Sequence, residues 1–416
     1  MRYFDVSEVQ FGESTGYARG ILTINRDDLI GLIAQDRRFK SVDVEIARPG
    51  ECVRITNVLD ILEPRIKEDS DDYFPGMLAP IRRAGDGNTN VLRGATVLEI
   101  GTLEGFYGGL IDMTGEGALL TPYSQTRNVC ILTEPATGVQ PIEYGSALKA
   151  AGLKTSVYLA QTTKGLQPTE TEIFALDRPG EDLSGLPRVG YLYQLHSHGD
   201  CREPFVYGEN TRRYYPTILH PNEVLDGAMV CGHYNIPMAH RNTTYTILNH
   251  PVILGLLRRH RRELNLRGVV IAPEPTSLTE IKRTSMMAAG LLKHALKVDG
   301  VIITKEGGGH TDVDLMENCE SCEALGIKTV LIDNEWLGPD GSGNFPLLTI
   351  SPKADAIVSV GNIDAIFNLP PMDKVIGGTS MFDLGSNLQE SVRILMRFVP
   401  SGISQVGFTY LTTEGR

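Results

Sequence analysis

The stretch GVIITKEGGGHTDVDLMENCESCEALGIKTVLIDNE, residues 300–335, decides the fold. It opens with a short apolar run at 300–304, crosses three glycines, follows a helical pattern over 312–325 and ends in a second apolar run at 328–333. Short continuous apolar runs are typical of strands buried on both faces of a sheet. Strand, helix and strand in this order predict a right-handed βαβ unit with parallel strands.

The same alternation extends to both sides of this unit. Apolar runs recur at 269–271 and 356–360, and residues 276–297 follow a helical pattern. We therefore predict an α/β fold with a doubly wound parallel-sheet domain over residues 246–416.

Residues 1–185 predict a strand-rich N-terminal domain. Val42, Val44 and Ile46 alternate with acidic residues, which is the period of a half-buried strand. Further predicted elements of this domain are strands at 53–62, 95–100 and 128–132 and a helix at 146–161. Residues 186–245 are expected to connect the two domains.

Composition excludes several classes of function. The 416 residues include 39 Lys and Arg against 51 Asp and Glu, a formal net charge of −12. Nucleic-acid binding needs a clustered basic surface, so we expect no nucleic-acid partner. No apolar run approaches the roughly 18 residues of a membrane-spanning helix, so we expect no membrane partner. Six cysteines are too sparse for a disulfide scaffold and indicate free thiols in a reducing cytoplasm.

Parallel sheets of this kind bind ligands at the carboxyl ends of their strands. One predicted end carries Glu306, the glycines Gly307, Gly308 and Gly309, and His310, and the next carries Asn334. The glycines could bring backbone N–H groups close to a carboxylate or phosphate, or they could simply form a tight turn. We predict Glu306 and His310 as catalytic residues, and the glycines and Asn334 as substrate-binding residues.

Histidines concentrate in the connecting segment. Five of the nine histidines lie between residues 196 and 240, together with Cys201 and Cys231. His196 and His198 form an HxH pair, and Cys231 and His233 form a CxH pair. Nitrogen and sulfur donors at this spacing suit Zn²⁺ or another late divalent transition metal, whereas the alternative is a chance cluster or a set of general acids. The predicted metal ligands are His196, His198, His233 and His240.

Several long motifs in one order carry a family resemblance. They are ITKEGGGHTDVDLMENCESCEALGIKTVLI at 303–332, LPPMDKVIGG at 369–378, PTILHPNEVLDGAMV at 216–230 and NTTYTILNHPVI at 242–253. With these motifs the chain resembles the component B proprotein, the alpha-type subunit, of glycine, sarcosine and betaine reductases. The resemblance extends over essentially the whole chain.

The resemblance implies an oxidoreductase subunit in a heteromeric complex. It implies self-cleavage ahead of a cysteine that becomes a pyruvoyl group, a small amine or amino-acid substrate, and a beta-type component B partner that bears a thiol or selenol. The only Asn-Cys dipeptide here is Asn318-Cys319, outside the processing region, so we expect no pyruvoyl group. The remaining candidates are Cys231 and Thr243, of which Thr243 would yield a 2-oxobutyryl group. Two alternatives stay open: a metal-dependent enzyme that uses the His/Cys site, and a non-catalytic scaffolding subunit.

Overall fold

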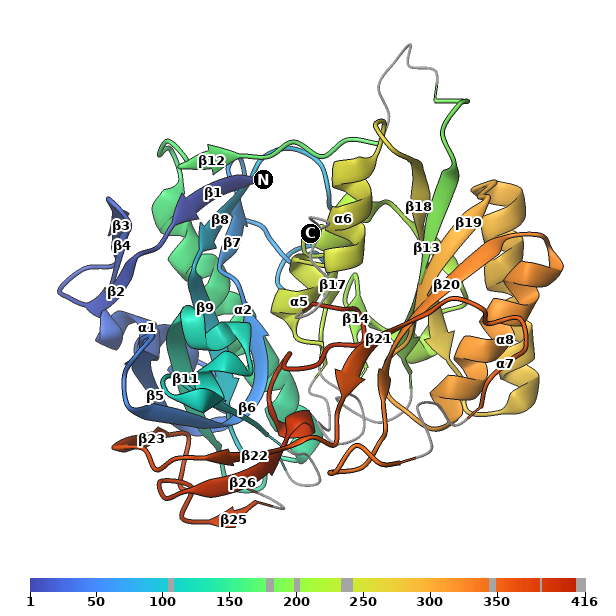
Figure 1. The fold of residues 1–416 in the computed structure, drawn as a ribbon. Coiled ribbons are helices and arrows are strands. Elements are labelled where there is room, and N and C mark those ends of the chain that lie inside the picture. The colour runs from blue at the N-terminus through green and yellow to red at the C-terminus, as the bar shows by residue number, and fades with distance from the viewer. Residues whose placement is uncertain are drawn as a thin grey trace.

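The computed structural model describes residues 1–103, 108–176, 183–197, 203–232, 242–343, 349–381 and 384–408. Two regions built on sheets lie side by side, with helices α5 (Thr244–Leu248) and α6 (Pro251–Arg259) between them (Figure 1). The mixture of helices, parallel strands and antiparallel strands confirms the predicted α/β class.

The larger α/β sheet has six strands in the order β16-β18-β13-β19-β20-β21. Their bounds are β13 Arg188–His196, β16 Thr217–Leu219, β18 Asn265–Glu274, β19 Gly300–Thr304, β20 Lys328–Glu335 and β21 Ile357–Asn362. β16 is antiparallel to β18, and the other five strands are parallel. The first strand of the chain in this parallel set, β13, therefore lies between the second and the third.

Helices cover both faces of this sheet. Tyr191 and Tyr193 of β13 pack with α5 and α6 in one buried core. Leu192 of the same strand packs on the opposite face against α7 (Leu278–Gly290) and α8 (His310–Ala324). A strand buried on both faces must be apolar at successive positions, which explains the continuous runs in the sequence. The predicted doubly wound parallel sheet is confirmed.

The described elements agree closely with the predicted ones. β19 occupies residues 300–304 as expected, and α8 begins two residues before its predicted start. The predicted helix at 276–297 is α7 followed by a π-helical turn, Leu291–Ala295. The sheet also contains β13, so it takes strands from both sides of residue 246, where we expected the α/β region to begin.

The N-terminal region contains a four-stranded sheet and a sheet of five strands, to which a strand from near the end of the chain adds a sixth. The first has the order β12-β1-β8-β7, with bounds Glu170–Thr171, Arg2–Asp5, Thr89–Arg93 and Arg65–Lys67. The second has the order β10-β6-β9-β11-β5, with bounds Gly109–Asp112, Val53–Leu62, Ala95–Ile100, Arg127–Pro135 and Phe39–Ala47. Helices α1 (Arg26–Ala34) and α2 (Pro141–Ala160) complete this region. All four predicted strands and the predicted helix are present.

The chain returns to the N-terminal region near its end. β23 (Lys374–Ile376) pairs in parallel with β6. Arg54, fully buried on β6, forms an ion pair with Asp112 and donates to the carbonyl oxygens of Leu388 and Pro370. β22 (Ile366–Leu369) and β26 (Val392–Leu395) pair beside this contact, at the lower left of Figure 1. The last part of the chain thus joins both regions.

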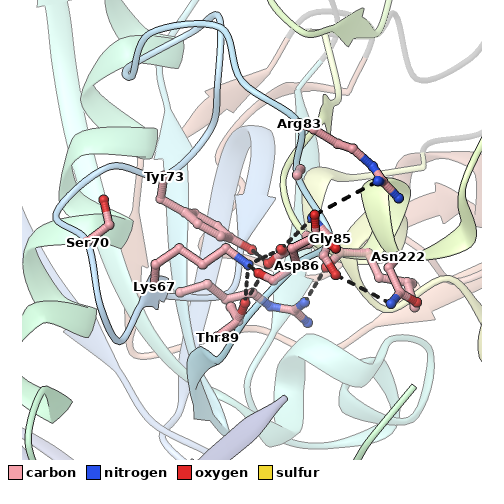
Figure 2. Close-up of polar contacts among 12 residues, drawn as sticks. Lys67, Ser70, Tyr73, Arg83, Gly85, Asp86, Thr89 and Asn222 are labelled. Carbon is pink, nitrogen blue, oxygen red and sulfur yellow. Dashed lines mark hydrogen bonds and ion pairs between the residues drawn. The ribbon is translucent and has the colours of Figure 1, made fainter. Parts of the chain in front are cut away.

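A second contact joins the long loop after β7 to α3 (Pro221–Leu225), as Figure 2 shows. The carboxylate of Asp226 accepts hydrogen bonds from the backbone N–H of Gly85 (2.8 Å) and the hydroxyl of Thr89 (2.6 Å), and it pairs with Lys67. Asn222 of α3 donates to the carbonyl oxygen of Gly85. One buried carboxylate therefore fixes the loop to the connecting segment, residues 186–245.

The remaining described strands are short. They are β2 Glu8–Phe11, β3 Gly16–Ala18, β4 Ile21–Ile24, β14 Phe205–Val206, β15 Glu209–Asn210, β17 Met229–Val230, β24 Ser380–Met381 and β25 Gly385–Ser386. Among the described helices, none combines the length and the apolar character needed to cross a membrane.

Candidate functional site

The candidate site lies where the order of the parallel strands reverses, between β13 and β19. Doubly wound sheets open a crevice at this point, beyond the carboxyl ends of the strands. Glu306, two residues after β19, is buried there. Its carboxylate accepts hydrogen bonds from the Tyr193 hydroxyl (2.7 Å), the His196 backbone N–H (2.9 Å) and the Asn242 side-chain amide (3.1 Å). These neutral donors hold the carboxylate in one orientation.

A second carboxyl group lies directly beside Glu306. Glu274, at the end of β18, accepts a hydrogen bond from the Glu306 backbone N–H at 2.7 Å. Its other oxygen, Oε2, is buried and has no hydrogen-bond partner among the described residues. Burial raises the pKa of Glu274 well above its usual value, and the charge of Glu306 adds to this effect. Burial therefore favours the protonated form of Glu274, and in that form the carboxyl group can donate a hydrogen bond.

Asn334 provides an unsatisfied amide on the same face of the sheet as Glu306. The last registered pair of β19 and β20 joins Thr304 to Ile332, and Glu306 and Asn334 each lie two residues further on. Asn334 is 1% exposed, and neither polar atom of its side chain has a partner among the described residues. An unpaired buried amide costs about 1–3 kcal/mol, and Asn334 as a substrate-binding residue stays a prediction.

The glycine turn is fixed from the far end of the chain. Gln405 accepts from the Gly307 backbone N–H (2.8 Å) and donates to the Gly307 carbonyl oxygen (2.7 Å). Gly307 and Gly309 have positive φ angles of 84° and 87°, and a Cβ on Gly308 would lie 2.4 Å from the Trp336 ring. Only glycine suits these three positions. A tight turn therefore accounts for the three glycines. Gln405 already accepts a hydrogen bond from one of the N–H groups that were predicted to bind substrate.

Lys305 supports the turn from the other face of the sheet. This lysine is fully buried, forms ion pairs with Asp312 (2.8 Å) and Asp333 (3.1 Å), and donates to the Gly307 carbonyl oxygen. Gln405 also donates to Asp333 at 3.0 Å. A buried cation between two carboxylates thus anchors the loop that presents Glu306.

The two predicted processing residues, Cys231 and Thr243, lie on either side of Asn242. The Cys231 thiol donates to the Asn242 carbonyl oxygen at 2.8 Å, and Ser404 donates to the Asn242 side chain at 2.7 Å. The Thr243 hydroxyl lies 2.6 Å from the Tyr123 hydroxyl and accepts from the Thr246 backbone N–H, which caps α5. The thiol therefore contacts the carbonyl group that immediately precedes Thr243.

A buried charge cluster of the N-terminal region supports this segment. Asp60 accepts from both the backbone N–H (2.8 Å) and the hydroxyl (2.5 Å) of Thr244, and that hydroxyl in turn accepts from the Cys231 backbone N–H. Lys149 pairs with Asp60 and with Glu99. Burial raises the pKa of Glu99 to about 6, although the lysine opposes the shift.

The structure brings some of the predicted site residues together and leaves others apart. Glu306 and Asn334 share a face of the sheet, and Cys231 reaches this group through Asn242. His310 begins α8 after the glycine turn, and burial lowers its pKa.

The predicted metal site stays a prediction. His196 ends β13 and is buried, whereas His198, His233 and His240 lie outside the described residues. Within the described ranges, no group of three or more His, Cys, Asp or Glu side chains could hold a metal ion.

Among the polar residues of the site that were not predicted are Tyr193, Asn242, Ser404 and Gln405. Tyr193 belongs to a strand that we assigned to the connecting segment, and Ser404 and Gln405 follow the last strand. The available signal was weak, since Ser404 and Gln405 stand as two polar residues within the apolar run 402–408, GISQVGF.

Comparison with known proteins gives a consistent result. The family model described as glycine/sarcosine/betaine reductase component B subunits matches residues 1–413. A protein of Acetoanaerobium sticklandii, glycine reductase complex component B subunits alpha and beta, is 37% identical over 98% of this chain and 97% of its own length.

Two relatives come from Peptoclostridium acidaminophilum. The sarcosine reductase complex component B subunit alpha is 41% identical over 89% of this chain and 87% of its own length. The betaine reductase complex component B subunit alpha is 36% identical over 90% and 86%, respectively. No solved structure matches the chain.

Proposed function

Because the chain belongs to the family of glycine/sarcosine/betaine reductase component B subunits, we propose that it is the alpha-type subunit of a two-component reductase. Its substrate is a small amine or amino-acid derivative. Its partner is a beta-type subunit that supplies the thiol or selenol nucleophile. The reaction is the reductive cleavage of a carbon–nitrogen bond.

The observation that carries this proposal is that Glu306 and Asn334 lie on one face of the sheet at its switch point. The switch point is the place between β13 and β19 where the order of the parallel strands reverses. The donors to Glu306 fix its orientation, and Asn334 has both amide atoms available among the described residues. A substrate ammonium group can donate to the carboxylate and to the amide oxygen, while the amide N–H₂ serves an acceptor on the substrate. Such contacts orient the amine before the partner attacks.

Reconstitution tests this function. The chain is co-expressed with a beta-type subunit of the family, purified as a complex and supplied with glycine, sarcosine or betaine together with a dithiol reductant. We expect a stable complex that releases ammonia or a methylated amine from at least one of the three substrates. Failure of the two chains to associate, or an associated complex that consumes none of the three, would contradict the proposal.

We further propose that the peptide bond between Asn242 and Thr243 is the processing site, in place of the family's pyruvoyl precursor. A pyruvoyl group cannot form from residue 243, because the methyl group on the Cβ of threonine stays in the product and makes it a 2-oxobutyryl group. Cys231 does not fit as the precursor, because its thiol contacts the carbonyl group of Asn242 and not its own preceding carbonyl. The contact from Cys231 polarises the Asn242 carbonyl and could stabilise an oxyanion at that atom. This contact supports Thr243 over Cys231 as the processed residue.

The bond changes are as follows. The Thr243 hydroxyl oxygen attacks the Asn242 carbonyl carbon, and the amide C–N bond breaks to give an ester. Loss of the Thr243 α-proton then expels the Asn242 carboxylate, and addition of water with loss of ammonia leaves a 2-oxobutyryl group at the new N-terminus. Such a keto group condenses with amines and withdraws electrons from the carbon that a nucleophile attacks.

Intact mass spectrometry of the purified chain tests this processing. Cleavage should give fragments 1–242 and 243–416 whose summed mass exceeds that of the intact chain by about 1 Da, whereas simple hydrolysis would add about 18 Da. Thr243→Val should abolish cleavage and Cys231→Ala should slow it, while Thr246→Val, in the same hydroxyl cluster, is the control. A wild-type chain that remains whole, or a Thr243→Val chain that is still cut, would exclude the site.

A further inference from the structure

A cavity of about 470 Å³ opens at the carboxyl ends of β13 and β18, beside the start of α7. Ser197 and Glu274 lie on its inner wall, and Arg212, Glu280 and Arg283 on its outer walls. Glu306 and Asn334 do not line this cavity. Glu274 nevertheless connects the two, because its carboxyl group also bonds the backbone N–H of Glu306.

Two arginines line the cavity, and their surroundings differ. Arg212 donates to the buried carboxylate of Glu203 through Nε (3.0 Å) and Nη2 (2.5 Å), which fixes its guanidinium group. Arg283, on the second turn of α7, is exposed and forms no ion pair with any described residue. A planar guanidinium group that lacks a partner suits bidentate binding of a carboxylate.

The inner end of the cavity offers a neutral donor. Glu274 is fully buried, and its Oε2 atom has no partner among the described residues. In its protonated form, which burial favours, this carboxyl group can donate through Oε2 to a ligand oxygen. The N-terminus of the 13-residue helix α7 adds a further positive potential at this end.

The same cavity also has groups that suit an ammonium ion. Glu280 lines it, and its carboxylate accepts from the Ser277 hydroxyl at 2.6 Å, which leaves further acceptor positions on the two oxygens. Tyr214 and Tyr215 form a wall, and aromatic faces attract ammonium groups, including methylated ones. Cations, an anion and aromatic rings around one small volume match a zwitterion.

We propose that this cavity binds a small zwitterionic amino acid, with its carboxylate on Arg283 and the Glu274 carboxyl group. The inference rests on the proposed function, and it assigns substrate recognition to residues next to, but distinct from, Glu306 and Asn334. The cavity is a recognition position for the zwitterion that is separate from the position at Glu306 and Asn334, where the ammonium group is oriented for the reaction. Glu274 links the bound carboxylate to the loop of Glu306, because its carboxyl group also accepts from the Glu306 backbone N–H.

Calorimetric titration of the full-length chain tests the cavity. The probes are glycine, sarcosine and betaine, with glycinamide as the matched amine that lacks a carboxylate. Arg283→Ala should weaken binding of the tightest carboxylate probe by about tenfold or more, and Arg283→Glu should weaken it further. Lys282→Ala removes an exposed positive charge one residue away and outside the cavity, so it should leave the affinity unchanged. Glycinamide should bind far more weakly than glycine to the wild-type chain.

The outcomes separate the two proposals. Equal affinity of wild type and Arg283→Ala, with binding lost in Asn334→Leu, would overturn the cavity and leave the function proposed for the switch point intact. Equal losses of affinity in Arg283→Ala and Lys282→Ala would show that the loss comes from the change in overall charge, and they would also overturn the cavity as the binding site. A wild-type chain that binds none of the three amino acids would overturn both.

Discussion

Two buried clusters of carboxyl groups, one in the N-terminal region and one at the α/β sheet, are compensated differently. In the N-terminal region, Asp60 and Glu99 share one buried lysine, Lys149. At the edge of the α/β sheet, Glu274 and Asp314 are held by neutral donors among the described residues. The first cluster is an ion-pair network. In the second, burial raises the pKa of both acids and favours their protonated forms.

This difference indicates what each cluster does. A buried charge network that is fully paired fixes geometry, here the position of Thr244 and through it Cys231. At the edge of the α/β sheet, by contrast, the buried Glu274 carboxyl group and the buried Asn334 amide keep polar atoms that have no partner among the described residues, which is typical of a site arranged for a ligand. We therefore assign support to the N-terminal cluster and chemistry to the edge of the α/β sheet.

Breaking the ion-pair network should have the largest effect on stability. Lys149→Met leaves Asp60 and Glu99 buried without their cation, which typically costs about 3–5 kcal/mol of unfolding free energy. Urea denaturation measures this loss. Lys154→Met, at an exposed position of the same helix, is the control and should cost little. Equal stability of the two variants would show that the network does not support the fold.

The switch point should behave in the opposite way. Asn334→Leu replaces an unpaired buried amide with an apolar side chain of similar size, so the unfolding free energy should rise by about 1–3 kcal/mol while turnover falls. Asn318→Leu is the matched control, because the Asn318 amide donates to the Asp314 backbone and carboxylate and should cost stability when lost. A loss of stability in Asn334→Leu comparable to that in Asn318→Leu would contradict a binding role.

The raised pKa of Asp314 predicts an effect on stability that depends on pH and is smaller for each pH unit than the effect of Lys149→Met. Burial raises the pKa of Asp314 from 3.8 to about 8, so the folded chain retains a proton that the unfolded chain releases. Stability should therefore fall as pH rises from about 4 to 8, by at most about 1.4 kcal/mol per pH unit from this group. Asp314→Asn cannot titrate, and its unfolding free energy between pH 5 and 8 should vary less steeply. Parallel profiles for variant and wild type would refute the assignment.

The sequence predicted the half of the site that follows from strand periodicity. Glu306 and Asn334 come directly after apolar runs, and the carboxyl ends of parallel strands meet at one edge of the sheet. The bounds of β19 and α8 follow from the same local pattern. The pattern is reliable because each of these strands is buried on both faces.

The partners of Glu306 could not be predicted in this way. Asn242 lies 64 residues from Glu306, and Gln405 lies 98 residues from Gly307, so their contacts depend on the packing of distant segments. The pairing of Lys149 with Asp60 likewise joins a helix to a strand 89 residues away. No local periodicity encodes such contacts. The strand β13 was missed as part of the sheet because its alternating tyrosines do not form a continuous aliphatic run.

The turnover of a reconstituted complex that carries Glu306→Gln tests the central claim most directly. The substitution keeps the size of the side chain and an oxygen that accepts from Tyr193 and Asn242, but it removes the carboxylate at the switch point. We predict a complex that assembles, with some loss of stability because the His196 backbone N–H loses its acceptor, and with turnover of the amine lowered by about 100-fold or more. A Glu306→Gln complex that releases the amine at the wild-type rate would contradict the account.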